Sequence, residues 1–101
     1  MDEQRRVARF LDDHDLSTPP AYRLLDLTSE LGELAKDVTE STAYGADPDG
    51  VAIAEDELGD TLFALLALAE ETDHDAGAAL ETALAKYERR LDASGSAGSG
   101  E

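Results

Sequence analysis

Apolar residues recur at alternating steps of three and four along the segment from Leu24 to Val38. The members of this stripe are Leu24, Leu27, Leu31, Leu34 and Val38. Such spacing is the period of an amphipathic α-helix, whose apolar face must be covered by a partner. The segment from Thr61 to Ala69 is apolar on all sides, which is typical of a buried central helix. Because no segment alternates with the period of a β-strand, an all-α fold is predicted.

Start and stop signals divide the chain into four predicted helices, two long and two shorter. Thr18 and Pro19 suit a cap and a first helical position, and the residues 44–50 have the Gly, Pro and Asp content of a loop. The first three expected helices span about 2–13, 19–42 and 51–72, and the fourth follows the break at 73–75 and runs to about 93. Asp73 or Asp75 is expected to cap the fourth helix, whose inward-facing residues are expected to be Leu80, Leu84, Tyr87 and Leu91.

The predicted architecture is a helical bundle in a single domain of residues 1–93, followed by a disordered Gly/Ser-rich tail of residues 94–101. A chain of 101 residues buries a modest share of its surface, so oligomerisation is expected to complete the core. It lacks cysteine, a signal peptide pattern and an apolar run that could span a bilayer. The expected location is the cytoplasm, with no membrane partner.

The formal net charge is −16, from 24 acidic and 8 basic residues. Binding of nucleic acid requires a basic surface, so nucleic acid is not expected as a partner. Only two of the basic residues are lysines, and an acidic, lysine-poor composition is typical of proteins from organisms with molar internal salt. At such salt the Debye length falls to about 3 Å, which screens self-repulsion. A halophilic origin is the hypothesis, and a mesophilic protein with an acidic surface is the alternative.

The tetrapeptide Glu-Leu-Gly-acid occurs twice, at residues 30–33 and 57–60. Two carboxylates three residues apart share one helix face, and Glu30 lies close enough to the leucine stripe to be partly buried. Two such helices side by side would bring four carboxylates together, which is unstable without a cation. Oxygen ligands alone favour Mg²⁺, or else Mn²⁺. For either pair alone a solvated helix face is the better interpretation, but both pairs border the predicted core.

Each motif also contains a glycine in the middle of a predicted helix. Glycine in a helix costs about 1 kcal/mol relative to alanine. Close approach of a neighbouring backbone to Gly32 and Gly59 is the expected compensation. The alternative is that both glycines are tolerated without one.

With these two motifs the chain resembles the MazG-like nucleotide pyrophosphohydrolases. Their pattern is Glu-x-x-Glu, a gap of some two dozen residues, and Glu-x-x-Asp. The matching residues are Glu30, Glu33, Glu57 and Asp60, within the helical segments 25–36 and 56–63. The resemblance extends from about Leu24 to Leu91, and the two motifs together are more specific than either alone.

The resemblance implies an enzyme that hydrolyses nucleoside triphosphates, NTP or dNTP, to the monophosphate and pyrophosphate, including house-cleaning of unwanted nucleotides. It implies that Glu30, Glu33, Glu57 and Asp60 bind Mg²⁺ and that the chain forms a homodimer or homotetramer. Either Glu33 or Glu30 would also orient or deprotonate the attacking water, with Glu33 preferred. The metal would neutralise the triphosphate and activate a bound water.

A triphosphate also needs positively charged side chains. Lys86 and Arg90 lie one turn apart on the fourth predicted helix and resemble basic residues late in the family's domain. Lys36 is a second candidate for substrate binding. The alternative for Lys86 and Arg90 is a surface pair that balances nearby acids. Tyr44 is expected either to stack on a base or to cap the core.

Two other functions compete with this interpretation. One is a phosphoribosyl-ATP pyrophosphohydrolase, which shares the all-α architecture and the metal carboxylates. The other is an acidic helical interaction module without catalysis, for which removal of the carboxylates would be harmless and Mg²⁺ would not change the melting temperature. The segment from Glu57 to Phe63 fits the MazG pattern better than that of the first competitor.

Overall fold

The computed structural model describes residues 1–95 and is helical, with no strand in this range. Its α-helices are α1 (Asp2–Asp13), α2 (Pro20–Ser41), α3 (Glu55–Glu71) and α4 (Ala76–Ser94), and a short 3₁₀ helix spans Pro48–Gly50. The all-α fold predicted from the sequence is confirmed. No helix of the described residues is both long enough and apolar enough to cross a membrane.

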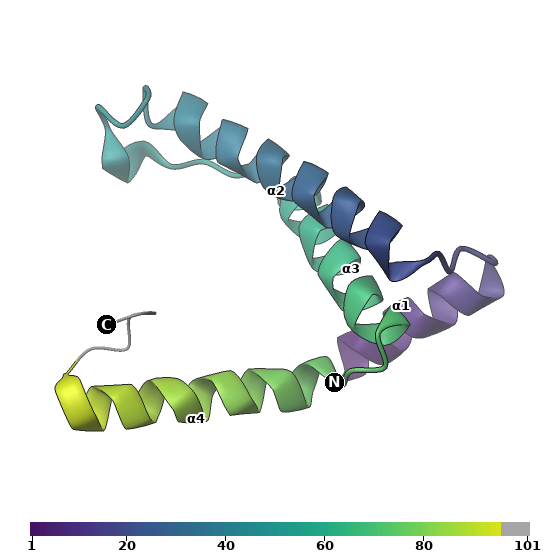
Figure 1. Ribbon diagram of the computed structural model, residues 1–101. Helices are drawn as coiled ribbons and strands as arrows, with labels where there is room; N and C mark the ends of the chain where they lie inside the picture. The colour runs from purple at the N-terminus through teal and green to yellow at the C-terminus, as the bar shows by residue number, and fades with distance from the viewer. Residues whose placement is uncertain (96–101) are drawn as a thin grey trace.

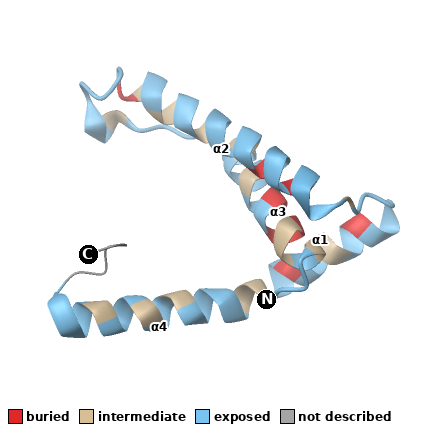
Figure 2. Ribbon diagram, in the orientation of Figure 1, coloured by how far each residue is buried: buried red, intermediate tan, exposed pale blue. Residues whose placement is uncertain are grey.

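Helix α3 lies at the centre of the molecule. It packs along α2 on one side and against α1 near its C-terminal end, whereas α4 extends away from the other three helices (Figure 1). The buried apolar residues gather where these three helices meet (Figure 2). They are Leu11, Leu27, Ala64, Leu66 and Ala67. The predicted central position of α3 is confirmed, but its burial on all sides is not, because Leu62 and Leu65 are 48% and 49% exposed.

The third helix begins at Glu55, four residues later than the sequence pattern predicts. Residues 51–54 are instead held against α2 by hydrogen bonds to its side chains. The backbone N–H of Ala52 donates to Ser41 Oγ at 2.9 Å, and that of Ala54 donates to Asp37 Oδ2 at 3.2 Å. These bonds satisfy the backbone donors outside a helix, so the helical period starts only after them.

Helix α4 does not pack as the sequence predicts. The four residues of α4 that were expected to face inward are 38–51% exposed and form no core within one chain. They are Leu80, Leu84, Tyr87 and Leu91. The radius of gyration is 16.5 Å, whereas a compact chain of this length has a value of about 13 Å. The periodicity gives the apolar face of a helix correctly but not the surface that covers it.

The orientation of α4 is set at its first turn. Asp75 caps the helix by accepting a hydrogen bond from the backbone N–H of Ala78 at 3.1 Å, which confirms one of the two predicted caps. Buried Gln4 of α1 donates to the carbonyl oxygen of His74 at 2.7 Å and accepts from the N–H of Ala76 at 2.6 Å. One side chain thus joins α1 to the turn between α3 and α4.

The structure corrects one of the two expectations for Tyr44 and the expected end of the fourth helix. Tyr44 is 83% exposed and does not cap the core. Helix α4 continues through Ser94 and ends at Gly95, whose φ of 74° is the left-handed conformation that glycine adopts readily at a helix end. Ser94 is therefore helical, and residues 96–101 of the predicted tail lie outside the described part of the chain.

The two motif glycines have open space beside them. A Cβ atom added to Gly32 or Gly59 would meet no atom within 4 Å apart from its own helix and chain neighbours. The expected close approach of another backbone is therefore wrong for the single chain. Each glycine carries the entropic cost of a helical glycine without a steric reason in the described residues.

We therefore expect Gly32→Ala to raise the free energy of unfolding by about 0.5–1 kcal/mol, since alanine restricts the unfolded chain and clashes with nothing. Urea denaturation in the presence of EDTA measures the effect. Gly45→Ala is the matched control and should destabilise the protein, because the φ of Gly45 is +91°. A loss of stability in Gly32→Ala would indicate that a second copy packs on this glycine.

Candidate functional site

The carboxylates of Glu57 and Asp37 face each other across the contact between α3 and α2. Glu57 is half-buried, and its Oε2 atom is enclosed without a hydrogen-bond partner in the described residues. Hydrogen bonding of its protonated form to Asp37, burial, and the charges of Asp37, Glu33 and Asp56 raise the pKa of Glu57 to about 7. The pKa of Asp37 is lowered, chiefly by the hydrogen bond with Glu57 and also by the N–H of Ala54.

This arrangement is an anionic pair that shares a proton when no cation is present. Two carboxylates at one site cannot both ionise easily, so one of them takes up a proton near neutral pH. A divalent cation would replace that proton and satisfy the enclosed oxygen of Glu57. The chemistry of the pair thus fits a hard cation, because both residues supply oxygen ligands alone.

Glu30 and Asp60 line a depression of about 400 Å³ between α2 and α3. Its other walls are Arg23, Asp26, Phe63 and Ala64. Glu30 is half-buried, as its position beside the leucine stripe predicts, whereas Asp60 is exposed. Acidic side chains of α2 and α3 therefore line this depression from two sides.

The four motif carboxylates form two pairs rather than one cluster. Glu33 lies close enough to Glu57 to raise its pKa, and Glu30 shares the depression with Asp60. In residues 1–95, no three acidic or histidine side chains come close enough together to hold a metal ion. Metal binding by these four residues thus stays a prediction.

Asp37 belongs to this site although the motif does not include it. The spacing of Asp37 is a usable signal, since it lies four residues after Glu33 and seven after Glu30, on the same face of α2. The structure shows what that signal lacked, namely the direct pairing of Asp37 with Glu57.

Of the three basic residues predicted to bind substrate, only Lys36 lies near the carboxylates in one chain. Lys36 lies on α2 beside Asp37, and its charge contributes to the lowered pKa of that carboxylate. Lys86 and Arg90 lie on α4, which points away from α2 and α3 in Figure 1. The Lys86 ammonium lies 4.9 Å from the centre of the Tyr87 ring. Within one chain, the structure does not place these two residues at the site, so contact with the substrate there would need a second copy.

Arg23 is the cationic residue that the sequence analysis missed. Its side chain is 9% exposed and forms an ion pair with Glu71 of α3, with Nε 2.9 Å from Oε1. A second nitrogen of the guanidinium donates to Glu71 Oε2 at 3.2 Å and to the carbonyl oxygen of Leu16 at 3.1 Å. Arg23 lies four residues before Leu27, on the buried stripe, which is the only signal that the sequence offered.

The carboxylate of Glu71 also holds the start of α2. The backbone N–H of Thr18 donates to Glu71 Oε2 at 2.8 Å. Pro19 occupies the cap position of α2 without a side-chain hydrogen bond, so Thr18 does not act as the cap that the sequence predicts. The two halves of the site, α2 and α3, are thus joined at one end by a buried ion pair.

One comparison with known proteins gives a match. A family model described as the MazG nucleotide pyrophosphohydrolase domain matches residues 20–93. No curated protein and no solved structure matches the chain. The matched range runs from the start of α2 into the last turn of α4 and contains both carboxylate motifs, whereas α1 precedes it. The chain therefore belongs to the MazG nucleotide pyrophosphohydrolase family.

Proposed function

We propose that this protein hydrolyses nucleoside triphosphates, NTP or dNTP, to the monophosphate and pyrophosphate in a Mg²⁺-dependent reaction. Membership of the family supports a nucleotide pyrophosphohydrolase in general. The observation that carries the proposal is the Glu57–Asp37 pair, in which an enclosed carboxylate oxygen has no hydrogen-bond partner in the described residues. A pair of this kind stabilises the fold poorly by itself and is suited to holding a cation.

Glu30, Glu33, Glu57 and Asp60 would hold the Mg²⁺, with Asp37 supporting Glu57. When bound, the ion supplies neutralisation of the triphosphate and a lowered pKa of a bound water. Glu33 is exposed beside Glu57, so it can approach a water molecule at the rim of the site, and we assign it the role of orienting and deprotonating the attacking water. Lys36 is the basic residue of the same chain that we assign to the phosphates.

We propose that the working form is a homodimer or homotetramer in the cytoplasm. The support is the exposed apolar face of α4, together with Leu24, Leu58 and Leu65, which are 49–56% exposed. Contiguous exposed apolar surface marks interaction sites in soluble proteins. Sedimentation equilibrium is expected to give the mass of two or four chains. A monomer at micromolar concentration would contradict the proposed assembly but not the proposed hydrolysis.

A panel of nucleotides assayed for pyrophosphate release, with Mg²⁺ and with EDTA, tests the activity. Release is expected from nucleoside triphosphates in the presence of Mg²⁺ alone. Phosphoribosyl-ATP belongs in the same panel, because hydrolysis of that compound alone would identify the competing enzyme. No hydrolysis of any member, with no change of melting temperature on addition of Mg²⁺, would leave the non-catalytic interaction module.

The pair also predicts how stability depends on pH. The folded-state pKa of Glu57 is about 7, above its ordinary value of 4.5, so the folded chain binds an extra proton between these values. The stability from this group is present below the ordinary pKa and is lost as the pH rises through the folded-state pKa. In EDTA, the melting temperature of the wild type should therefore fall from about pH 5 to about pH 8 by more than that of Glu57→Gln.

Mg²⁺ should oppose this loss, because a cation stabilises the ionised pair. The increase in melting temperature on addition of Mg²⁺ is expected to be larger near pH 8 than near pH 5, where protons compete for the carboxylates. The lowered pKa of Asp37 affects stability only at acidic pH, so it does not change the expected difference between pH 5 and pH 8. An equal Mg²⁺ effect at both pH values would contradict binding at this pair.

A further inference from the structure

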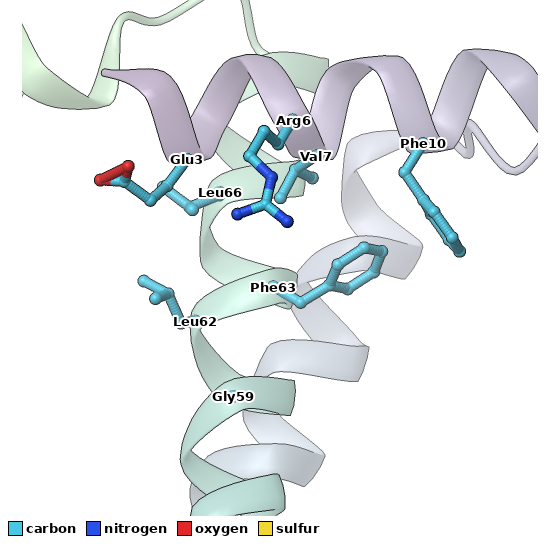
Figure 3. A pocket seen from close by; sticks show the side chains of 8 residues that line it. All are labelled: Glu3, Arg6, Val7, Phe10, Gly59, Leu62, Phe63 and Leu66. Atoms are coloured by element: carbon cyan, nitrogen blue, oxygen red, sulfur yellow. The ribbon is translucent and has the colours of Figure 1, made fainter.

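A groove between α1 and α3 lies beside the carboxylates and has no role in the function described above. Its volume is about 340 Å³, at the lower end of the range for ligand sites, about 300–1,000 Å³. The lining residues are Glu3, Arg6, Val7, Phe10, Gly59, Leu62, Phe63 and Leu66 (Figure 3). Six of the eight are apolar or glycine, so the groove suits a flat apolar ligand with a few polar atoms.

The groove shares a wall with the depression at the carboxylates. Phe63 lines both the groove and the depression that contains Glu30 and Asp60. Gly59, at the edge of the groove, directly precedes Asp60. A ligand with its phosphates at the carboxylates could therefore place its other end on the α1 side of Phe63.

Phe63 is held between two neighbours, which makes it a fixed wall. The ring of Phe10 packs against it edge-on, with ring centres 5.9 Å apart and an angle of 89° between the rings. The guanidinium carbon of Arg23 lies 5.8 Å from the centre of the Phe63 ring. Arg23 is itself fixed by Glu71, so the wall between the two sites is pre-organised before any ligand binds.

Arg6 supplies the polar group of the groove. Its guanidinium extends from α1 toward α3, above Phe63, whereas the carboxylate of Glu3 lies at the far end of the groove from Phe10 (Figure 3). Arg6 makes no hydrogen bond and no ion pair within the described residues, although the chain has three times as many acids as bases. Five N–H donors are thus available in a largely apolar setting.

We propose that this groove binds the nucleoside end of the substrate and that Arg6 donates hydrogen bonds to the edge of the base. The proposal rests on the proposed function, because the carboxylate site fixes where the phosphates lie. The guanidinium can only donate, so it favours acceptor atoms. Guanine presents O6 and N7, and thymine and uracil present O4, whereas adenine and cytosine present an amino group at the corresponding position. Arg6 therefore selects keto bases over amino bases.

The test is the ratio of kcat/KM values for nucleotides that differ in this group. The wild type should prefer dGTP to dATP, and dTTP to dCTP, by at least about fivefold, the lower limit for a good base contact of this kind. Arg6→Met keeps the apolar stem and removes the donors, so both ratios should fall to near one. The loss should appear mainly as a higher KM for the keto nucleotides, since Arg6 contacts the base and not the reacting phosphate.

Arg9→Met is the matched control. Arg9 lies one turn further along α1, is exposed, and does not line the groove. This variant should keep the wild-type ratios. Equal kcat/KM values for all four nucleotides in the wild type, or a preference that survives in Arg6→Met, would overturn the proposal and leave the triphosphate chemistry standing.

A binding measurement separates the groove from the activity. Methyl NMR signals of Val7, Leu62 and Leu66 should shift on addition of 5′-GMP without metal and should not shift with pyrophosphate alone. The shifts should be weaker for 5′-AMP. If these signals respond to dilution of the protein and not to 5′-GMP, the groove is a contact between copies of the chain, and the proposal fails even if the enzyme is active.

Discussion

Glu57→Gln should reduce pyrophosphate release by a factor on the order of 10² or more, because a neutral amide is a poor ligand for a hard cation. Loss of a residue that only supports a metal ligand costs about 10–100-fold, and Glu57 is assigned to the ligand set itself. The loss should appear in kcat/KM at saturating Mg²⁺, measured with the preferred triphosphate of the panel.

The same substitution should leave the fold intact or stabilise it in EDTA. Removing one of two facing carboxylates relieves the repulsion that raises the pKa of Glu57 in the wild type. Circular dichroism should show unchanged helical content, and the increase of melting temperature with Mg²⁺ should be small or absent. A residue with a structural role alone would give the opposite pattern, with lower stability in EDTA and an intact response to Mg²⁺.

Glu55→Gln is the matched control for this experiment. Glu55 lies in the same first turn of α3, is exposed, and makes no hydrogen bond or ion pair within the described residues. Its activity should remain within about twofold of wild type, since a surface charge far from any partner contributes little. Loss of activity in both variants would mean that the negative charge of the turn, and not the position of Glu57, supports catalysis.

The sequence predicted the helices and the carboxylate faces because both depend on local spacing. On α2, Leu27 of the predicted stripe is buried, and Glu30 beside the stripe is half-buried as its position predicts. Leu24 and Leu31 of the same stripe are each 51% exposed, so the stripe is only partly covered within one chain. Asp75 was one of two predicted caps for the same reason, since a cap acts within three residues. Local rules of this kind need no knowledge of the rest of the chain.

What the sequence did not give are the contacts between residues far apart in the chain. The apolar face of α4 was identified, but periodicity cannot distinguish a face covered by the same chain from one left for a partner. The first helical residue of α3 was misplaced because side chains of α2 capture the backbone of 51–54. The pairing of Arg23 with Glu71 joins residues 48 positions apart, and only the position of Arg23 on an apolar face pointed to it.

That pairing is the basis of the second large effect. Glu71→Ala should lower the free energy of unfolding by about 3–5 kcal/mol, because it leaves the guanidinium of Arg23 buried without its counter-ion. The exposed fractions of the two side chains are 9% and 7%, so water cannot easily replace the lost carboxylate. A domain of this size has a total stability of about 5–15 kcal/mol, so the variant should be partly unfolded at moderate temperature. Urea denaturation measures the change.

Asp26→Ala provides the comparison for a solvated pair. Asp26 is 61% exposed and lies 3.5 Å from the same guanidinium, so its loss should cost at most about 1 kcal/mol. The double variant Arg23→Met, Glu71→Leu should recover most of the stability of the wild type, since replacing a buried ion pair by apolar side chains is often neutral or favourable. Recovery would show that the cost in Glu71→Ala comes from the uncompensated charge and not from lost packing.

The stability contributed by the ion pair also depends on pH, and it does so in the opposite direction from that of the Glu57 pair. Burial raises the pKa of Glu71, but the hydrogen bonds from Arg23 and from the N–H of Thr18, with the charge of Arg23, outweigh burial and lower it overall. The stability that Glu71 contributes is therefore present above the ordinary pKa of glutamate and is lost as the pH falls through the lowered folded-state pKa. Acid should thus reduce the stability of the wild type by more than that of Glu71→Ala, whereas the Glu57 pair loses its contribution as the pH rises. If Glu71→Ala and the wild type lose the same stability in acid, the ion pair is not what holds α2 to α3.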